Sequence, residues 1–418
     1  MQRPTLDAAR GFDRPVYVVA GGRLLNVFGS GLVYPFATVH FHLAVGLPLS
    51  LVGLGLFANN AALAAGTALG GYLSDRYGRK PVMVASMALS ALSLSAYALV
   101  RTAPGFVAVA TAAGLTAGLY APASQAALAD LTDAEDRERG YGLLKVASNA
   151  GFGSGFVVGG LLYEAAGVAI FVVDGLTSAL VAALLVVALP RVHAGRDAAT
   201  LRDALADWRG AVARRRVLAL AVLNVGFAAM YAQMNTTVPV VAKRGLGLTA
   251  SQLGTLYVLN PVVLVALQMP VVSAVGAWRR TRGLVVSAGF WAASMFAAWG
   301  ATVGAADHGR LPRLLAVGLV GGHLVLRTVG EILHSPLVAA LASDLGGGAD
   351  RGARLSVMEV AKRVGMGAGS AVGGAFFDHG AAALLWPTLV VGCLGLAAGL
   401  LRLERRLSPA ENGVAGGG

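Results

Sequence analysis

Three ionisable residues late in the sequence are spaced four residues apart: His323, Arg327 and Glu331. Arg and Glu are charged at neutral pH, and His titrates near it. A spacing of four places them along one stripe of an α-helix. The surrounding stretch is apolar, and a charged group inside a membrane is so unfavourable that each is a candidate functional residue. Arg327 can keep Glu331 ionised in one conformation, and separating the two side chains would favour protonation of Glu331 in another. The stripe predicts a proton-coupling site with His323 as the competing carrier, and a static ion pair that fixes helix packing is the alternative.

Two further ionisable residues lie in apolar stretches of the first half of the sequence. Asp174 is a candidate second proton site, with a partnered structural acid as the alternative. Arg23 lies about 13 Å of helix beyond Arg14, which is too deep for easy hydration. It can bind an anionic group or neutralise an acid, unless it extends back to the lipid headgroups.

Polar and aromatic side chains also occur within the apolar stretches. Such residues suit a mixed cavity that binds small molecules by stacking and hydrogen bonding, although many of them serve only to join helices. We expect the following to line a substrate cavity: Asn26, Tyr34, Tyr231, Gln233, Asn260 and Gln268.

The elements that must position these residues follow from the composition. Of the 418 residues, 56% are hydrophobic and 13% are charged, and the mean hydropathy is +0.69. A water-soluble fold could not bury so much apolar surface. The apolar runs are roughly 20 residues or longer, as membrane-spanning helices require, whereas barrel strands would be half as long. The sequence therefore predicts an all-α membrane protein.

Clusters of Gly, Pro and charged residues divide the sequence into twelve apolar runs, which form two sets of six. The runs lie near 15–40, 48–73, 81–100, 104–129, 142–163 and 166–190, and then near 217–242, 250–275, 283–304, 314–342, 356–377 and 381–402. A shift of 214 residues superposes Pro122 on Pro336, Asp130 on Asp344, and the Gly residues of 151–160 on those of 365–374. This repeat predicts two duplicated six-helix halves.

The predicted domains follow from these runs. A first half of six transmembrane helices spans 1–190, and a second spans 217–403. Between them, residues 191–216 form a cytoplasmic linker in which apolar residues at helical spacing predict an amphipathic helix. Residues 404–418 end in Gly-rich sequence and are expected to be a disordered cytoplasmic tail.

The charge distribution predicts the orientation. The net charge is +12, and we assign about 26 of the 33 Lys and Arg residues to one face, which the positive-inside rule makes cytoplasmic. Both termini are therefore expected in the cytoplasm, with the chain spanning the inner (plasma) membrane many times. Basic residues confined to short loops argue against nucleic-acid binding. The single Cys393 excludes an intramolecular disulfide.

Motifs for several other functions are missing from the sequence. It contains no nucleotide-binding loop, zinc-ligand spacing or nucleophile elbow. We therefore expect no enzyme activity, no cofactor, no metal and no direct use of ATP. An ion or solute gradient is left as the energy source.

A short charged segment, Gly71 to Met83, separates the second and third apolar runs. It resembles the loop signature of the major facilitator superfamily, Gly-x-Leu-Ala-Asp-Arg-x-Gly-Arg-Lys. The matching residues are Gly71, Leu73, Asp75, Arg76, Gly78, Arg79 and Lys80. The resemblance implies a secondary transporter of twelve helices in two six-helix halves, with the substrate site between them.

The same resemblance implies a conformational latch made of Gly71, Asp75, Arg76, Gly78, Arg79, Lys80 and Asp130. In it, Arg79 pairs with Asp130, and Asp75 meets the start of the eleventh helix. A topological stop, in which the basic residues only keep the loop inside, is the alternative.

Two further resemblances concern the branch of the superfamily. The glycines Gly151, Gly155, Gly159 and Gly160 are similar to an antiporter motif, although Phe156 replaces its Pro, and plain helix packing is the alternative role for them. Glu331 and Pro336 lie in a segment similar to a tenth-helix pattern of drug exporters and peptide transporters. In such transporters the seventh helix faces the cavity, which favours Tyr231 and Gln233 as cavity residues.

The leading hypothesis is a monomeric proton-coupled exporter of small amphipathic organic compounds or drugs, which works by alternating access in the lipid bilayer. A proton-coupled uptake symporter or facilitator of a sugar, peptide or organic acid is the first alternative. A non-transporting membrane sensor or scaffold is the second.

Overall fold

The computed structural model describes residues 11–133, 135–190, 208–276, 278–306, 312–345 and 351–413. Within these ranges the regular structure is entirely helical. Helices dominate because lipid offers no hydrogen-bond partners to the backbone, so each segment must satisfy its own N–H and C=O groups. The predicted all-α fold is confirmed.

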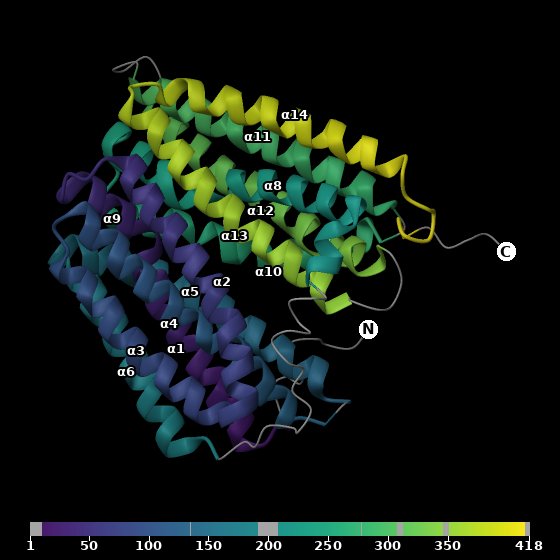
Figure 1. Cartoon of the computed structure of the whole chain (residues 1–418). Coiled ribbons are helices and arrows are strands. Elements are labelled where there is room, and N and C mark those ends of the chain that lie inside the picture. Colours follow the sequence, from purple (N-terminus) through teal and green to yellow (C-terminus); the bar gives the residue numbers. More distant parts are fainter. Residues whose placement is uncertain are drawn as a thin grey trace. The chain divides into compact units, whose positions relative to one another are not determined.

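The first half of the sequence forms six long helical segments (Figure 1). They are α1 (Arg14–Thr38) continued by η2 (Val39–Ala44), α2 (Leu49–Tyr77), α3 (Arg79–Ala96) continued by η3 (Tyr97–Leu99), α4 (Ala103–Asp130), α5 (Arg137–Ala166) and α6 (Ala169–Ala188).

The second half gives six corresponding segments, one of which is broken. They are α8 (Arg215–Val240) continued by η4 (Val241–Gly245), α9 (Ala250–Tyr257) with α10 (Leu259–Ala274), α11 (Arg280–Ala306), α12 (Arg313–Asp344), α13 (Arg351–Asp378) and α14 (Ala382–Glu404). The break falls at Val258. Pro261 lies just after it and has no N–H to donate to the Tyr257 carbonyl, which explains the interruption.

Ten of the described segments are long and apolar enough to cross a membrane. The other two long helices, α5 and α13, have 30 and 28 residues, so they are not too short. They are less apolar because both are rich in Gly and carry several charged residues.

Contacts between residues divide the chain into two compact units. Unit 1 comprises Met1–Val45, Ala58–Ala198 and Thr249–Val258, and unit 2 comprises Gly46–Phe57, Ala199–Leu248 and Leu259–Gly418. The division therefore departs from the predicted sequence halves. The start of α2 belongs to unit 2, and α9 belongs to unit 1.

The core of each unit forms where long helices pack side by side. In unit 1, α1 packs on α5 and α6, and α3 packs on α6. Its apolar core includes Val19, Met83, Met87 and Leu185, all fully buried. In unit 2, α8 packs on α13, and α11 packs on α12 and α14 (Figure 1).

The 214-residue repeat is a repeat of helix packing. A Cβ atom added to Gly155 of α5 would lie 2.4 Å from the Phe28 carbonyl oxygen of α1. One added to Gly369 of α13 would lie 2.5 Å from the Ala229 carbonyl oxygen of α8. Both positions must lack a side chain because two helix backbones meet there.

The segment after α14 is held in place by polar contacts. Arg216 Nη1 lies 2.7 Å from Glu411 Oε2, and the Thr281 N–H donates to Asn412 Oδ1 at 3.0 Å. Burial of Glu411 acts to raise the pKa of its carboxyl, but hydrogen bonds from Ser408 and Arg216 outweigh it and lower this pKa. Residues 404–413 thus differ from the disordered tail expected at 404–418, and 414–418 lie outside the described residues.

Most of the linker expected at 191–216 also lies outside the described residues. These include Leu201 and Leu205, on which the prediction of an amphipathic helix partly rests. Residues 208–213 are described and helical.

Candidate functional site

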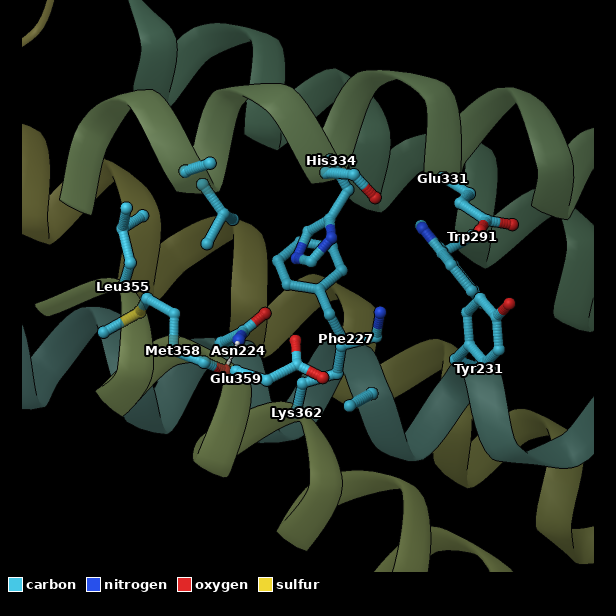
Figure 2. Close-up of a pocket in the computed structure, with 14 residues that line it drawn as sticks. Asn224, Phe227, Tyr231, Trp291, Glu331, His334, Leu355, Met358, Glu359 and Lys362 are labelled. Carbon is cyan, nitrogen blue, oxygen red and sulfur yellow. Dashed lines mark hydrogen bonds between the residues drawn. The ribbon is translucent and has the colours of Figure 1, made fainter. Parts of the chain in front are cut away.

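Unit 2 contains a cavity of about 320 Å³ between α8, α11, α12 and α13 (Figure 2). This volume is at the lower end of the range for small-molecule sites, which is about 300–1,000 Å³. Three aromatic residues line it: Phe227, Tyr231 and Trp291. Four titratable residues line it as well: Glu331, His334, Glu359 and Lys362.

Arg327 and Glu331 form an ion pair at the edge of this cavity. Arg327 Nη2 lies 3.2 Å from Glu331 Oε2, one helical turn away on α12. The Arg327 side chain is fully buried, whereas the Glu331 side chain is 19% exposed and lines the cavity. The pair therefore has one member that a substrate or water can reach, and that member is the carboxylate.

Aromatic rings support the guanidinium group of this pair. The Arg327 Cζ atom lies 4.1 Å from the centroid of the Tyr231 ring and 5.7 Å from that of Trp291. An arginine over an aromatic face is stabilised by the negative face of the ring. Tyr231 and Trp291 also line the cavity, so one surface of aromatic rings contacts both the ion pair and the cavity (Figure 2).

His323, the third member of the predicted stripe, lies away from this cavity. It is buried, and its Nδ1 atom lies 3.0 Å from the Ser294 carbonyl oxygen. The Ser294 hydroxyl donates to the His323 carbonyl oxygen at 3.2 Å. These contacts join α11 to α12. Of the two proton carriers considered, Glu331 is the one that lines the cavity.

Of the 14 residues that line the cavity, only Tyr231 and Glu331 were among the predicted site residues; the missed residues include Trp291, His334, Glu359 and Lys362. Glu359 and Lys362 fall within the apolar run predicted at 356–377, so the rule applied to Glu331 would also have found them. His334 follows Glu331 by three residues, which places it on the same side of α12.

The two carboxylates that line the cavity both have basic partners one turn away. Glu331 pairs with Arg327, and Glu359 Oε1 lies 2.7 Å from Arg363 Nη2. Lys362 has no ion-pair partner among the residues that the structure describes, and its Nζ atom lies 5.9 Å from the Tyr231 ring centroid. The charged groups around the cavity therefore leave one positive charge in excess.

The predicted cavity residues of the second half have different positions. Tyr231 lines the cavity, as expected. Gln233 does not: it is 1% exposed, and its Nε2 atom donates to the carbonyl oxygens of Ala229 at 2.9 Å and Gly369 at 3.0 Å. Gln233 thus joins α8 to α13. Asn260 donates to Thr328 Oγ1 at 2.8 Å and joins α10 to α12, and Gln268 lies on α10 outside the lining.

The candidates in the first half belong to unit 1. Arg23 Nε donates to Ser148 Oγ at 2.9 Å, so it is bound to a hydroxyl of α5. Asn26 Nδ2 lies 3.7 Å from the Met87 sulfur. Tyr34 is exposed and meets the Phe152 ring edge-on.

Asp174, the remaining ionisable candidate, is buried in the second turn of α6. It lies against α1 at a glycine, because a Cβ added to Gly29 would come 2.3 Å from Asp174 Oδ1. Its role as a second proton site stays a prediction.

The ion pair expected between Arg79 and Asp130 is present. Arg79 Nε lies 3.0 Å from Asp130 Oδ2, and Nη1 of the same guanidinium pairs with Asp75. The Arg79 side chain is nearly buried, so one cation joins the end of α2 to the end of α4. The contact of Asp75 with the start of the eleventh predicted helix stays a prediction.

The other residues of this loop have distinct local roles. Gly78 has a φ of 94° between α2 and α3, a conformation that favours glycine. Lys80 Nζ donates to the Val186 and Leu189 carbonyl oxygens at the end of α6, which have no intrahelical partner. Arg76 donates to the Tyr72 hydroxyl at 2.9 Å, and nothing lies within 4 Å of a Cβ added to Gly71.

The helices and the cavity define an all-α membrane protein with room for a small molecule between its helices. Residues 19–324 match the model of the Major Facilitator Superfamily, and the chain belongs to this family. It is therefore a membrane-spanning transporter.

Relatives and solved structures agree with this assignment. The chain is 24% identical over 402 residues to the uncharacterized MFS-type transporter YttB of Bacillus subtilis, covering 95% of this chain and 97% of YttB. It is 24% identical over 400 residues to the multidrug resistance protein MdtH of Photorhabdus laumondii, covering 91% of each. The crystal structure of the POT family transporter PepTSo superposes with a TM-score of 0.80 at 12% identity, covering 95% of this chain and 98% of that one.

Proposed function

We propose that the protein is a proton-coupled secondary transporter that exports small amphipathic organic compounds from the cell in exchange for protons. It works as a monomer in the inner membrane by alternating access. The observation that carries the proposal is the position of Glu331, a half-buried carboxylate that lines the cavity and pairs with Arg327 at 3.2 Å.

The lining of the cavity supports a substrate with both apolar and polar parts. Phe227, Tyr231 and Trp291 offer ring faces, and Glu331 offers a carboxylate beside them. A cationic or hydrogen-bond-donating substrate and a proton compete for this carboxylate. Since each lowers the affinity for the other, they move in opposite directions across the membrane. The similarity to MdtH, which is named a multidrug resistance protein, favours export of such compounds.

Glu331→Gln tests the proton site. The purified protein is reconstituted in liposomes, and a pH gradient of either direction is imposed across their membrane. Uptake of ethidium, an amphipathic aromatic cation, is followed by fluorescence. We expect gradient-driven uptake to be lost in Glu331→Gln, while exchange of ethidium at equal pH continues. Glu359→Gln is the matched control, because it removes another carboxylate of the cavity whose partner is Arg363. Unchanged dependence on the gradient in Glu331→Gln would remove Glu331 from the mechanism.

A second candidate function is symport of a proton with an organic anion, and Lys362 favours it. Both lining carboxylates are paired, whereas Lys362 has no ion pair among the described residues. Protonation of Glu331 would add positive charge to the cavity and strengthen binding of an anion there. Proton and anion would then bind together and move in the same direction.

The pH dependence of binding separates the two candidates. Ethidium and naphthalene-2-sulfonate keep their charges when the pH is lowered, and quenching of tryptophan fluorescence can report their binding because Trp291 lines the cavity. Exchange predicts that lowering the pH weakens the binding of ethidium. Symport predicts that lowering the pH strengthens the binding of the sulfonate, and that Lys362→Met abolishes this binding. In either case Glu331→Gln should remove the pH dependence.

A further inference from the structure

The lining of the cavity in unit 2 contains three buried side-chain atoms that have no hydrogen-bond partner among the residues that the structure describes. They are Asn224 Oδ1, Trp291 Nε1 and His334 Nε2. Buried polar atoms are normally paired, so each of the three needs an explanation. Trp291 Nε1 is packed against α12, because a Cβ added to Gly330 would lie 2.8 Å from it. The other two atoms are left for a ligand of the cavity.

The side chain of Asn224 is oriented by the other end of its amide group. Asn224 is 3% exposed, and its Nδ2 atom donates to the Met358 carbonyl oxygen at 2.7 Å, which joins α8 to α13. A carbonyl oxygen only accepts, so the nitrogen of the amide must face Met358 and the oxygen must face away. Asn224 Oδ1 is therefore a fixed acceptor that needs a donor.

His334 is held beside the same part of α8 by a ring contact. The centroids of the His334 and Phe227 rings are 4.4 Å apart (Figure 2). Phe227 follows Asn224 by three residues and lies on the same side of α8. We assign the hydrogen of the neutral imidazole to Nδ1, because Nε2 is the nitrogen that is buried without a partner. His334 Nε2 is then a second acceptor.

These two acceptors are separate from the proposed proton site. Figure 2 shows two aromatic rings and Glu331 at one end of the cavity and Leu355 at the other, with Asn224 and His334 between them. The cavity therefore has a polar subsite of its own, and all of its residues belong to unit 2.

The charges of the cavity decide which kind of donor fits this subsite. Glu359 Oε1 already pairs with Arg363 Nη2 at 2.7 Å, and Lys362 has no ion-pair partner among the described residues. An ammonium group would meet the charge of Lys362 with no free carboxylate beside the subsite, so a neutral N–H is favoured. Two acceptors suit the two N–H bonds of one planar NH2 group, and Lys362 can donate to an acceptor next to that group.

We propose that Asn224 and His334 form a selectivity subsite for neutral aromatic compounds that carry a planar NH2 group beside an acceptor, as a primary carboxamide does. The NH2 group donates to Asn224 Oδ1 and His334 Nε2, and the aromatic ring lies against Phe227. The inference rests on the proposed function in taking this cavity as the substrate site, and it names the class of substrate. It leaves Glu331 to the proton.

Two probes of nearly equal shape test the proposal without a transport assay. Naphthalene-2-carboxamide and 2-acetylnaphthalene share the ring and the carbonyl group, and they differ only in NH2 against CH3. Binding of the tritiated carboxamide to the full-length protein in lipid nanodiscs is measured by scintillation proximity, and competition gives the Kd of the acetyl compound. Empty nanodiscs correct for partition into lipid. The selectivity ratio is the Kd of the acetyl compound divided by that of the carboxamide. We expect a ratio of about 10 to 30, because the acetyl compound lacks two neutral hydrogen bonds.

Asn224→Leu and His334→Phe should each lower this ratio about three- to fivefold, since each removes one acceptor. His334→Phe keeps an aromatic ring beside Phe227 and does not touch the bond to Met358, so it tests the subsite even if Asn224→Leu fails to fold. The matched control is Ser335→Ala, which removes an exposed polar group of the lining next to His334. The ratio of this control should equal that of the unchanged protein.

Glu331→Gln separates this inference from the proposed function. The ratio should persist in that variant, because Glu331 lies at another part of the cavity (Figure 2). A persistent ratio in a protein whose transport ignores the pH gradient would support the subsite and remove the proton coupling. A ratio near one in the unchanged protein, or a ratio that His334→Phe leaves at the control value, would overturn the subsite. Loss of the ratio in Glu331→Gln would also overturn it, since the NH2 group would then bind at the carboxylate.

Discussion

Gly78 is the residue of the charged loop whose backbone only glycine adopts without strain. Its φ and ψ are 94° and 158°, a region that is essentially restricted to glycine. We expect Gly78→Ala to destabilise the protein by about 1–3 kcal/mol, because the Cβ atom meets the local backbone in this conformation. The measurement is the melting temperature of the detergent-solubilised protein.

Gly71→Ala is the control for this prediction. Gly71 belongs to the same motif, but it is helical, and nothing lies within 4 Å of an added Cβ. The melting temperature of Gly71→Ala should therefore stay near that of the unchanged protein. Equal loss of stability in both variants would show that the loop needs these glycines for a reason other than backbone conformation.

The partners of single residues could be predicted where the prediction depends on local sequence spacing or on a local motif. The ion pair of Arg327 and Glu331 follows from a separation of four residues, and Arg79 with Asp130 follows from the loop motif. Orientation within a helix was harder to predict. Tyr231 and Gln233 are two residues apart and so point about 200° away from each other, and only Tyr231 lines the cavity. Because α8 is apolar on nearly all sides, its sequence does not show which face meets the cavity.

At the scale of elements, the packing of α5 on α1 depends on the absence of a side chain at Gly155. An added Cβ would lie 2.4 Å from the Phe28 carbonyl oxygen and 2.9 Å from the Gly31 Cα, so the helices would have to move apart. We expect Gly155→Ala to lower stability, since overpacking typically costs about 1–3 kcal/mol and exceeds the helix-propensity gain of about 1 kcal/mol. The fraction of monodisperse protein after heating measures this.

Gly142→Ala on the same helix separates packing from helix propensity. Gly142 is exposed, and nothing lies within 4 Å of an added Cβ, so only the gain in helix propensity applies. We expect this variant to be as stable as the unchanged protein or slightly more stable. A Gly155→Ala protein as stable as Gly142→Ala would contradict the close packing of α5 on α1.

The helices themselves were predictable because membrane-spanning runs are long and their flanks carry Gly, Pro and charge. Most of the expected runs differ from the helices by only a few residues at each end. The break at Val258 was not predicted, although Pro261 indicates it. The assignment of residues 49–57 and α9 to other units than their neighbours depends on contacts between distant segments: Leu49 and Asp378 are 329 residues apart, and Ser251 and Glu164 are 87 residues apart. No local pattern records such contacts.

At the scale of the whole molecule, the net charge of the cavity decides whether proton and substrate would move in opposite directions or together. Single sequence motifs do not give this net charge. The antiporter-like glycines of α5 serve helix packing, and Gly155 and Gly369 do so equivalently in the two units. They therefore say little about the direction of transport. The excess positive charge contributed by Lys362 became clear only once the partners of Glu331 and Glu359 were known. This is why the sequence predicted a transporter but left exchange and symport open.

The orientation of the whole chain in the membrane is predicted from the distribution of basic residues alone. Basic residues gather where α2 ends and α3 begins, at Arg76, Arg79 and Lys80, and again after α14, at Arg405 and Arg406. The positive-inside rule places these ends in the cytoplasm. Pro48 precedes α2, and because that helix crosses the membrane once, its start must face the other side.

Cysteines introduced at two exposed positions test this orientation. In both variants the native Cys393 is changed to Ala, so that only the introduced cysteine can react. Pro48→Cys should react with a membrane-impermeant maleimide in intact bacterial spheroplasts, whereas Ala410→Cys should react only after lysis, since both positions are exposed but on opposite faces. The unlabelled Cys393→Ala protein is the control for background. Reaction of Ala410→Cys in intact spheroplasts would place the tail outside. In that case the basic loop between α2 and α3 and the basic residues after α14 would face outward, and the orientation predicted from the positive-inside rule would be wrong.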